Sequence, residues 1–302
     1  MIALVMGMWK QARGLTPQRV GALLSLVATS VTAAGDSSVL SFERDGAPVR
    51  EISVQRLSEQ CGLRPVWVER DPYYETSKVY LACPLHTVLD LGFAAPAAPG
   101  ATFILRARDG YSKTASAERL AESGGYLAFA DLGEFARDAT EPPVPVPWPP
   151  IGRSGADPSP LYMVWTGVDQ ADPHHYPWPY QLASIEIGSF EGRYPRTVPS
   201  SAPADSPARA GYEIFKRECV ACHAVNGEGG KVGPDLNVPR GISEYRPRAQ
   251  IKAFIRNPES FRYTSMPSNL HLSERDLDAL VAYFDVMKDL KHDPKQVDTG
   301  DL

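Results

Sequence analysis

Two cysteines stand three positions apart in this chain of 302 residues, and a histidine directly follows the second, in Cys219-Val-Ala-Cys222-His223. Thiols at this spacing serve as zinc ligands, as a redox-active dithiol or as the attachment site of a haem. A zinc site needs a second Cys/His pair, and the only candidates, His271 and His292, are badly spaced. A dithiol does not need the histidine. The motif therefore favours covalent haem attachment, with both thiols bonded to the porphyrin and the imidazole on the iron.

The first 34 residues are typical of a secretory signal peptide. A basic segment without acidic residues precedes an apolar run, and Thr32-Ala33-Ala34 offers small residues for cleavage. The run is too short for a membrane span, so we expect a periplasmic protein with no span in the mature chain; an uncleaved anchor is the alternative. A start at Met8 would give a more ordinary signal. Export agrees with a haem, because an oxidising compartment would close a free thiol pair into a disulfide.

The composition changes along the chain and predicts a multidomain protein. We expect a signal peptide at 1–34, a strand-rich α+β domain at 35–195, a Pro/Ala/Ser linker at 196–208, an all-α domain at 209–292 and a polar tail at 293–302. The segment PSSAPADSPA, residues 199–208, can bury little apolar surface and is expected to be extended and exposed. The formal net charge is −5, and no long basic block is present, so we expect no nucleic-acid partner.

Two amphipathic helices are predicted around the haem motif. The first runs from Ala208 to Glu218, with Gly211 and Phe215 on one side. The second follows an N-cap at Ser273 and an acidic first turn. Its apolar residues recur at helical spacing: Leu277, Leu280, Val281, Phe284 and Met287. Because Gly211 has no side chain, an aromatic residue from Tyr283-Phe284 can approach it closely, and we predict that the helices cross there.

The iron of an attached haem takes a second axial ligand or keeps an open position. Met266 precedes a proline in the polar loop YTSMP, where packing alone explains a methionine poorly. His271 is the rival ligand, whereas Met287 lies on the apolar face of the last helix and is expected to pack. A methionine raises the reduction potential relative to a second nitrogen ligand.

One residue is predicted to support the proximal histidine. Pro234, in GKVGPDL, has a free carbonyl that can accept the Nδ1–H of His223. This bond would orient the imidazole and raise its basicity. A plain surface turn is the alternative.

Residues 209–290 resemble a class I cytochrome c. The resemblance rests on GYEIFKRECVACH, GPDL, MP and LVAYF, in that order. It implies a small all-α fold around one covalent haem c, with His223 and Met266 as axial ligands and one haem edge near the surface. The residues that hold the haem propionates stay open. The candidates are Arg240, Tyr245, Arg246 and Arg248.

The N-terminal domain contains strand-like stretches separated by turns, with one short helix expected among them. The strand-like stretches are Arg50–Leu57, Arg64–Arg70, Lys78–Phe93, Ala101–Ser112, Gly125–Leu132, Leu161–Trp165 and Tyr180–Ile187. Asp109-Gly110 indicates a tight turn.

The segments DPYYETSKVYLACPLHTVL, ARDGYS and WPYQLASIEI resemble the sulfite-oxidase-type molybdopterin-binding domain. In that family a cysteine thiolate binds molybdenum. Neither Cys61 nor Cys83 lies in a stretch that matches the metal-binding loop, so we expect a relative without molybdopterin.

Two other features of this domain have alternative interpretations. Cys61 and Cys83 either form a disulfide, as an exported protein allows, or are two buried free thiols. His174 and His175 lie in a loop with Asp169 and Asp172 as the only obvious helpers for a metal. Adjacent side chains rarely converge on one ion, so a surface loop is expected. The tryptophans of this region, Trp148, Trp165 and Trp178, are expected to pack the domain or its contact with the haem domain.

Together these features predict an electron-transfer protein rather than a stand-alone enzyme. We expect a periplasmic monohaem cytochrome that exchanges single electrons with a redox protein partner, a dehydrogenase or an oxidase. The N-terminal domain is expected to serve as a docking or scaffold unit. The alternatives are a molybdenum-cofactor oxidoreductase with an internal haem acceptor and a haem-based ligand sensor in which Met266 leaves the iron.

Overall fold

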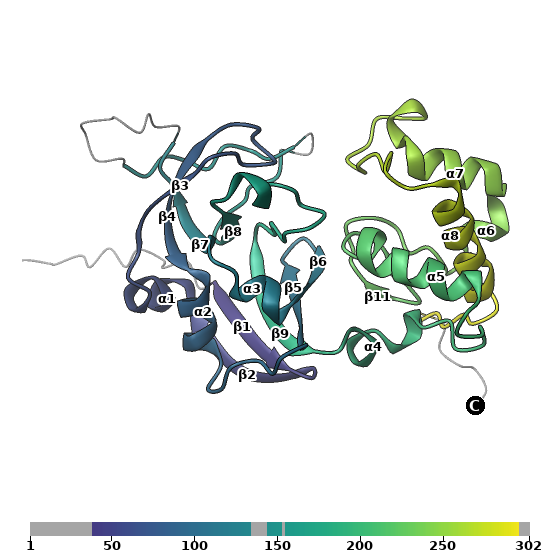
Figure 1. Ribbon diagram of the computed structural model, residues 1–302, viewed down its shortest axis with the longest axis horizontal. Coiled ribbons are helices and arrows are strands. Elements are labelled where there is room, and N and C mark those ends of the chain that lie inside the picture. The colour runs from purple at the N-terminus through teal and green to yellow at the C-terminus, as the bar shows by residue number, and fades with distance from the viewer. Residues whose placement is uncertain (1–37, 134–143, 153–154, 296–302) are drawn as a thin grey trace, which may run out of the picture. The chain divides into compact units, whose positions relative to one another are not determined.

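A computed structural model describes residues 38–133, 144–152 and 155–295 (Figure 1). The predicted signal peptide, residues 1–34, and residues 296–302 of the predicted tail lie outside these ranges. A strand-rich region is followed by a helical region, which fits a multidomain chain. Within the described ranges, no helix combines the length and the apolar character that a bilayer span requires.

The first sheet has the strand order β2-β1-β9-β5-β6. Its strands are β1 (Val39–Arg44), β2 (Ala47–Ser53), β5 (Thr102–Ala107), β6 (Ser112–Ser116) and β9 (Leu182–Gly188). Strands β1 and β9 are parallel, and the other neighbours are antiparallel. A strand near β2 was predicted from the sequence, whereas β1 was not. The sequence signal for a hairpin of β1 and β2 was Asp45-Gly46. Their positive φ angles of 49° and 79° make the two-residue turn that suits a hairpin.

The second sheet has the order β3-β4-β7-β8 and is antiparallel throughout. Its strands are β3 (Arg64–Val68), β4 (Lys78–Pro84), β7 (Gly125–Asp131) and β8 (Tyr162–Trp165). The tryptophans pack as expected: Trp165 and Trp178 are fully buried and donate their indole N–H groups to the carbonyls of Pro177 and Gln170. Trp148 stacks on Tyr80. These aromatic rings belong to the core of the strand-rich region.

The expectation of one short helix in this region is wrong. Among the described residues of this region, four short α-helices follow strands: α1 (Val54–Gln60), α2 (Leu85–Gly92), α3 (Ala117–Ala121) and α4 (Phe190–Arg193). Helix α1 replaces the second half of the predicted strand Arg50–Leu57. The reason is local: the hydroxyl of Ser53 accepts a hydrogen bond from the backbone N–H of Arg56, which caps the helix N-terminus. The caps of α3 and α4 are also serines, Ser116 and Ser189.

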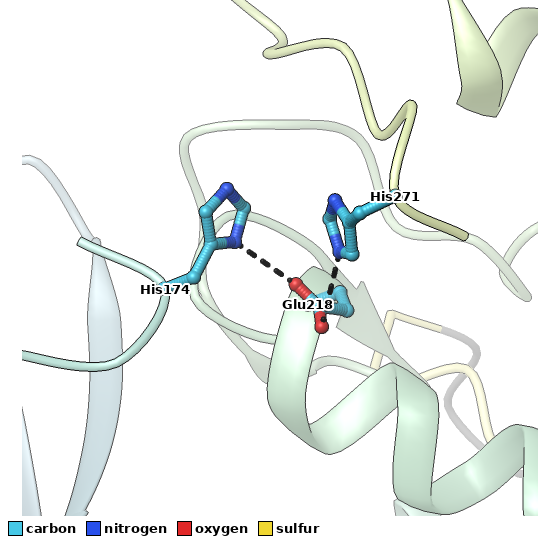
Figure 2. Close-up of side chains that lie close together, drawn as sticks. All are labelled: His174, Glu218 and His271. Atoms are coloured by element: carbon cyan, nitrogen blue, oxygen red, sulfur yellow. Dashed lines mark hydrogen bonds and ion pairs between the residues drawn. The ribbon is translucent and has the colours of Figure 1, made fainter. Parts of the chain in front are cut away.

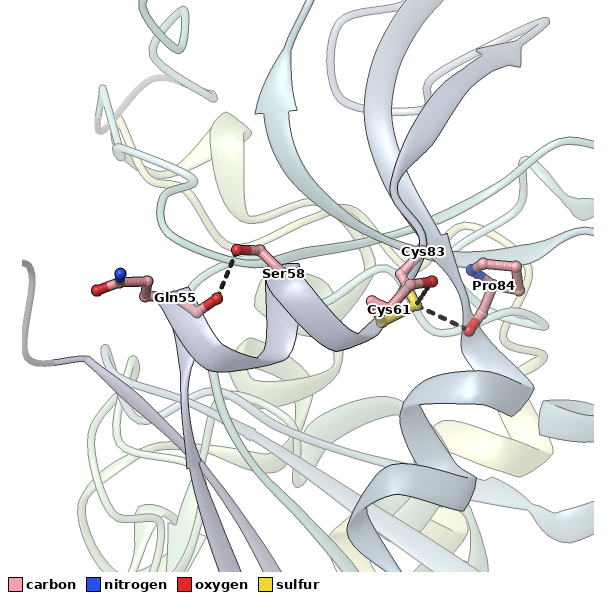
Figure 3. Close-up of a disulfide and its surroundings, with 5 residues drawn as sticks. All are labelled: Gln55, Ser58, Cys61, Cys83 and Pro84. Atoms are coloured by element: carbon pink, nitrogen blue, oxygen red, sulfur yellow. Dashed lines mark hydrogen bonds between the residues drawn. A yellow bond between two sulfur atoms is a disulfide. The ribbon is translucent and has the colours of Figure 1, made fainter.

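Cys61 and Cys83 form a disulfide, which settles the alternative that the sequence left open. Figure 3 shows it joining the residue that ends α1 to strand β4. Both cysteines are buried, and their Cα atoms are 5.6 Å apart. The bond closes a loop with a sequence separation of 22 residues. Such a bond contributes about 2–4 kcal/mol, because it restricts the unfolded chain.

The helical region has a second hydrophobic core. Its elements are α5 (Pro207–Ile214), β10 (Ala224–Val225), β11 (Glu228–Gly229), α6 (Ile242–Tyr245), α7 (Arg248–Arg256) and α8 (Glu274–Met287). Helix α8 begins as predicted, with the Ser273 hydroxyl accepting from the backbone N–H of Asp276. The predicted apolar face of α8 is buried, and Met287, at 1% exposure, packs in this core as expected.

Helices α5 and α8 cross at Gly211, as the sequence predicted. A Cβ atom at this position would lie 2.0 Å from the carbonyl oxygen of Ala279 and 2.9 Å from the Cβ of Tyr283. No residue other than glycine fits this approach. Phe215 is buried on the same side, and its ring lies 5.3 Å from that of Tyr283. The hydroxyl of Tyr283 donates to the carbonyl of Thr197.

The segment 199–208 is not extended, which corrects the expected linker conformation. It forms successive turns, in which the N–H of Ala202 bonds the carbonyl of Pro199 and the N–H of Ser206 bonds the carbonyl of Pro203. Ala202 and Ala208 are buried. Its last residues belong to α5, because Ser206 is an N-cap and proline is well accommodated in the first turn of a helix.

Candidate functional site

The helical region contains a cavity of about 520 Å³, in the size range of cofactor sites. The five residues that the sequence proposed to hold the haem and its iron line this one cavity: Cys219, Cys222, His223, Pro234 and Met266. Much of the remaining lining is apolar, with side chains from α6, α7 and α8 such as Ile242, Phe254 and Phe284. Thus two thiols, an imidazole and a thioether converge on one largely apolar space.

A change of helix type at the end of α5 presents the motif to this cavity. Residues Phe215–Cys219 form a π-helical turn, in which the N–H of Val220 bonds the carbonyl of Phe215. Such turns occur often at functional sites. The N–H groups of Cys222 and His223 then both bond the carbonyl of Cys219. This tight turn places both thiols and the imidazole along the same cavity.

The surroundings of both thiols disfavour the thiolate form. Burial raises the pKa of the Cys219 thiol to about 12 and that of the Cys222 thiol to about 11. A redox-active dithiol needs the opposite, a lowered pKa that generates thiolate at neutral pH. Cys219 and Cys222 are both partly buried. Their environment therefore disagrees with the dithiol alternative.

His223 makes the hydrogen bond that the sequence predicted. Its Nδ1–H donates to the carbonyl oxygen of Pro234 over 2.8 Å, which leaves Nε2 as the nitrogen that can bind a metal. Burial lowers the pKa of the His223 imidazole, and this favours the neutral ring that metal binding needs. The N–H of Gly233 bonds the carbonyl of Cys222, so the GPDL segment is tied to the motif.

Met266 lies in the loop between α7 and α8 and packs against the second core. Its backbone N–H donates to the hydroxyl of Thr264. The amide of Asn269 is buried and donates to the carbonyls of Ile255 and Pro267, which ties the loop to the end of α7. The methionine is therefore held by its loop at the cavity wall.

Only two of the four propionate candidates line the cavity. Tyr245 and Arg246 line the cavity, whereas Arg248 pairs with Asp285 at 2.6 Å. Arg240 lies 5.8 Å from the ring of Tyr245. Arg262, a further cationic residue of the lining, was not among the candidates from the sequence. Its closeness to Met266 in sequence was the available signal.

His271, the rival ligand, is not among the residues that line the cavity. It pairs instead with Glu218, as does His174. His175 pairs with Asp172, and its side chain is 72% exposed, as expected for a surface loop. The two adjacent histidines therefore serve different carboxylates, and the set His174, His175, Asp169 and Asp172 does not form a common site. No signal in the sequence could have joined His174 to Glu218, because the two are far apart in the chain.

Comparison with known proteins agrees with the chemistry of the cavity. Residues 206–284 match the family "Cytochrome C oxidase, cbb3-type, subunit III". Cytochrome c oxidase subunit 2 of Alkalihalophilus pseudofirmus is 28% identical over 125 residues, which cover 38% of this chain and 36% of the relative. The chain thus matches about a third of that relative's length. The C-terminal match supports a cytochrome c domain and with it haem binding.

Proposed function

We propose that this chain is an exported monohaem c-type cytochrome of class I fold that carries single electrons between redox proteins. The observation that carries the proposal is the convergence of Cys219, Cys222, His223 and Met266 on one cavity. When bound, a haem supplies a one-electron iron couple. In this proposal the cytochrome domain spans residues 209–292, and a signal peptide at 1–34 directs the chain to the periplasm.

The residues of the cavity have separate roles in this proposal. Cys219 and Cys222 would hold the macrocycle through thioethers, and His223 and Met266 would bind its iron. The carbonyl of Pro234 fixes the ring plane of His223 and raises its basicity. The thioether of Met266 favours the reduced metal. The apolar lining excludes water, which also favours the less charged state.

An apolar rim supports a protein partner. Val232, Tyr245 and Phe261 line the cavity, yet they are 49%, 49% and 47% exposed. Exposed apolar side chains around a functional cavity are typical of a docking surface. The relative is a subunit of an oxidase, so an oxidase or a dehydrogenase is the class of partner that we propose.

The strand-rich domain is proposed to be a sulfite-oxidase-like scaffold, residues 35–195, without molybdopterin. The chain has four cysteines in total. Cys61 and Cys83 form the disulfide, and the other two belong to the haem motif. This supports the proposal, because no thiolate remains to bind molybdenum. A scaffold role is supported by two backbone hydrogen bonds to the motif region: Ser112 N–H to Ala221 O and Lys231 N–H to Gly110 O.

The test is to express the full chain in a host that matures c-type cytochromes. We expect the pigment to stay with the protein after acid-acetone extraction, one iron per chain and no molybdenum. Met266→Leu should abolish the long-wavelength sulfur-to-iron band of the oxidised protein, and the matched variant Met287→Leu should keep it.

A pigment released by acid-acetone would refute covalent attachment, and one molybdenum per iron would favour the oxidoreductase. Prompt carbon monoxide binding by the reduced wild type would favour the sensor.

A further inference from the structure

Three side chains from distant parts of the chain meet beside the haem motif: His174, Glu218 and His271 (Figure 2). His174 comes from the loop between β8 and β9, Glu218 from the π-helical turn and His271 from the loop before α8. One ligand atom of each lies within 4.8 Å of the other two. Glu218 lines the cavity but neither histidine does, so the cluster borders the cavity without sharing a proposed iron ligand.

Two distances in this cluster, from each histidine to one oxygen of the Glu218 carboxylate, are close to the spacing of ligands around a metal ion. Nδ1 of His174 is 3.2 Å from Oε2 of Glu218, and Nε2 of His271 is 3.4 Å from Oε1. Two ligands bound tetrahedrally at zinc, each about 2.0–2.1 Å from the ion, lie about 3.3–3.4 Å apart. The nitrogen and oxygen atoms therefore stand near the required separations already.

Each ligand is held in place by its own surroundings. The side chain of Glu218 is 4% exposed, and Nε of Arg217 donates to its Oε1. The backbone N–H of His174 bonds the carboxylate of Asp172, which fixes the turn. The rings of His174 and His271 meet edge to face with centroids 4.8 Å apart, so both face the same carboxylate (Figure 2). Fixed ligands of this kind reduce the entropy that metal binding costs.

We propose that His174, Glu218 and His271 bind a divalent transition-metal ion of the zinc class. Two imidazoles and one carboxylate are a common protein ligand set for Zn²⁺, with water in the fourth position. Solvent can reach that position, because the side chains of His174 and His271 are 44% and 46% exposed. The cation of Arg217 shares the carboxylate, so the site suits a modest affinity rather than a permanently bound ion.

The proposed metal site joins three segments: the loop that carries His174, the turn that precedes the haem motif and the loop that carries Met266. Glu218 directly precedes Cys219, and His271 lies in the loop that also carries Met266. A bound ion would tie these three segments together and stiffen the loop of Met266. Metal binding itself does not depend on the proposed haem function, so the two can fail separately.

The test is a calorimetric titration of the EDTA-treated full chain with ZnCl₂. Cys219 and Cys222 are either bonded to haem or alkylated beforehand, so that thiols cannot compete. We expect one equivalent of zinc. His174→Ala and His271→Ala should each weaken binding at least tenfold, whereas the matched control His175→Ala should leave it unchanged.

The visible and circular dichroism spectra of each variant show whether it is folded. Both histidines are half exposed, so the variants should fold like the wild type. The proposal is overturned if the wild type takes up no zinc at millimolar concentration. It is also overturned if His175→Ala weakens binding as much as His174→Ala, or if His271→Ala binds as tightly as the wild type.

Discussion

At the scale of single residues, Asp71 is the most completely satisfied buried carboxylate of the strand-rich region. It is 0% exposed and accepts hydrogen bonds from the backbone N–H groups of Tyr73 and Tyr74 and from the hydroxyls of Tyr80 and Tyr162. Burial raises the pKa of its carboxyl, and these bonds oppose the rise. A buried polar group of this kind is tolerated only because its partners are complete.

Asp71→Ala should therefore destabilise the protein by about 2–5 kcal/mol, because it strands several buried donors at once. Asp71→Asn keeps one acceptor for the two backbone N–H groups and should cost less. Urea unfolding followed by far-ultraviolet circular dichroism measures both values. Equal losses for the two variants would show that the hydrogen bonds do not set the cost.

The two cysteine pairs of the chain differ in their bonding and in their surroundings. Cys61 and Cys83 come together because the end of α1 lies against β4, and they bond to each other. Cys219 and Cys222 share one tight turn on the wall of a cavity. The spacing of the second pair was visible in the sequence, whereas the meeting of the first pair depended on the fold.

At the scale of elements, the crossing of α5 and α8 organises the helical region. The two backbones approach so closely at Gly211 that a Cβ atom would lie 2.0 Å from the carbonyl of Ala279. Because backbone atoms cannot rotate away, any side chain there must push the helices apart.

Gly211→Ala should lower the unfolding free energy by about 1–3 kcal/mol, the usual cost of overpacking. Ala210→Ser, on the exposed side of the same helix, should change it by less than about 0.5 kcal/mol. Thermal unfolding followed at 222 nm compares the two. A neutral Gly211→Ala would mean that the helices can separate at no cost.

Helices α7 and α8 are joined by a small ion-pair network. Lys252 contacts Glu274 at 2.7 Å and Asp278 at 2.6 Å, and Arg256 contacts Glu274 at 2.5 Å. Hydrogen bonds from Lys252 and Arg256 lower the pKa of the Glu274 carboxyl to about 2, from 4.5. The network is exposed, so its contribution to stability is small and depends on salt.

The sign of its pH dependence follows from the lowered pKa. Stability from Glu274 is complete above pH 4.5 and is lost as the pH falls from 4.5 towards 2. The melting temperature of the wild type should therefore exceed that of Glu274→Gln at neutral pH and low salt. This difference in melting temperature should disappear at pH 2–3. Melting curves of both proteins across this range are the measurement. If the difference in melting temperature did not change with pH, it would have to come from packing rather than from charge.

At the scale of the whole molecule, the described residues form two separate hydrophobic cores. The disulfide belongs to the core of the strand-rich region. The residues that line the haem cavity belong to the helical region.

Removing the disulfide with Cys61→Ala/Cys83→Ala should lower the stability of the strand-rich region by about 2–4 kcal/mol. The haem absorption spectrum should not change, because this substitution does not touch the second core. Unfolding is followed in parallel by tryptophan fluorescence and by the visible spectrum. A matching loss in both signals would show that the two cores unfold as one unit.

Much of the helical region could be predicted from the sequence, since its signals are local. Ser273 caps α8, the apolar residues of α8 recur at helical spacing, and a CxxCH motif needs only one turn of chain to set its geometry. The hairpin at Asp45-Gly46 was missed although its signal was present. Helix α1 was predicted as a strand because its short apolar pattern is ambiguous, and the cap at Ser53 decided it.

The sequence by itself determined the haem motif, the helices that carry it and the likeness to a cytochrome c, because covalent chemistry and helical periodicity act over a few residues. Only the tertiary structure decided that Met266, rather than His271, lines the cavity and that His174 reaches Glu218. It also decided that Cys61 meets Cys83. These contacts join residues far apart in the chain, and the burial of apolar surface that brings them together has no direction that a local pattern could record.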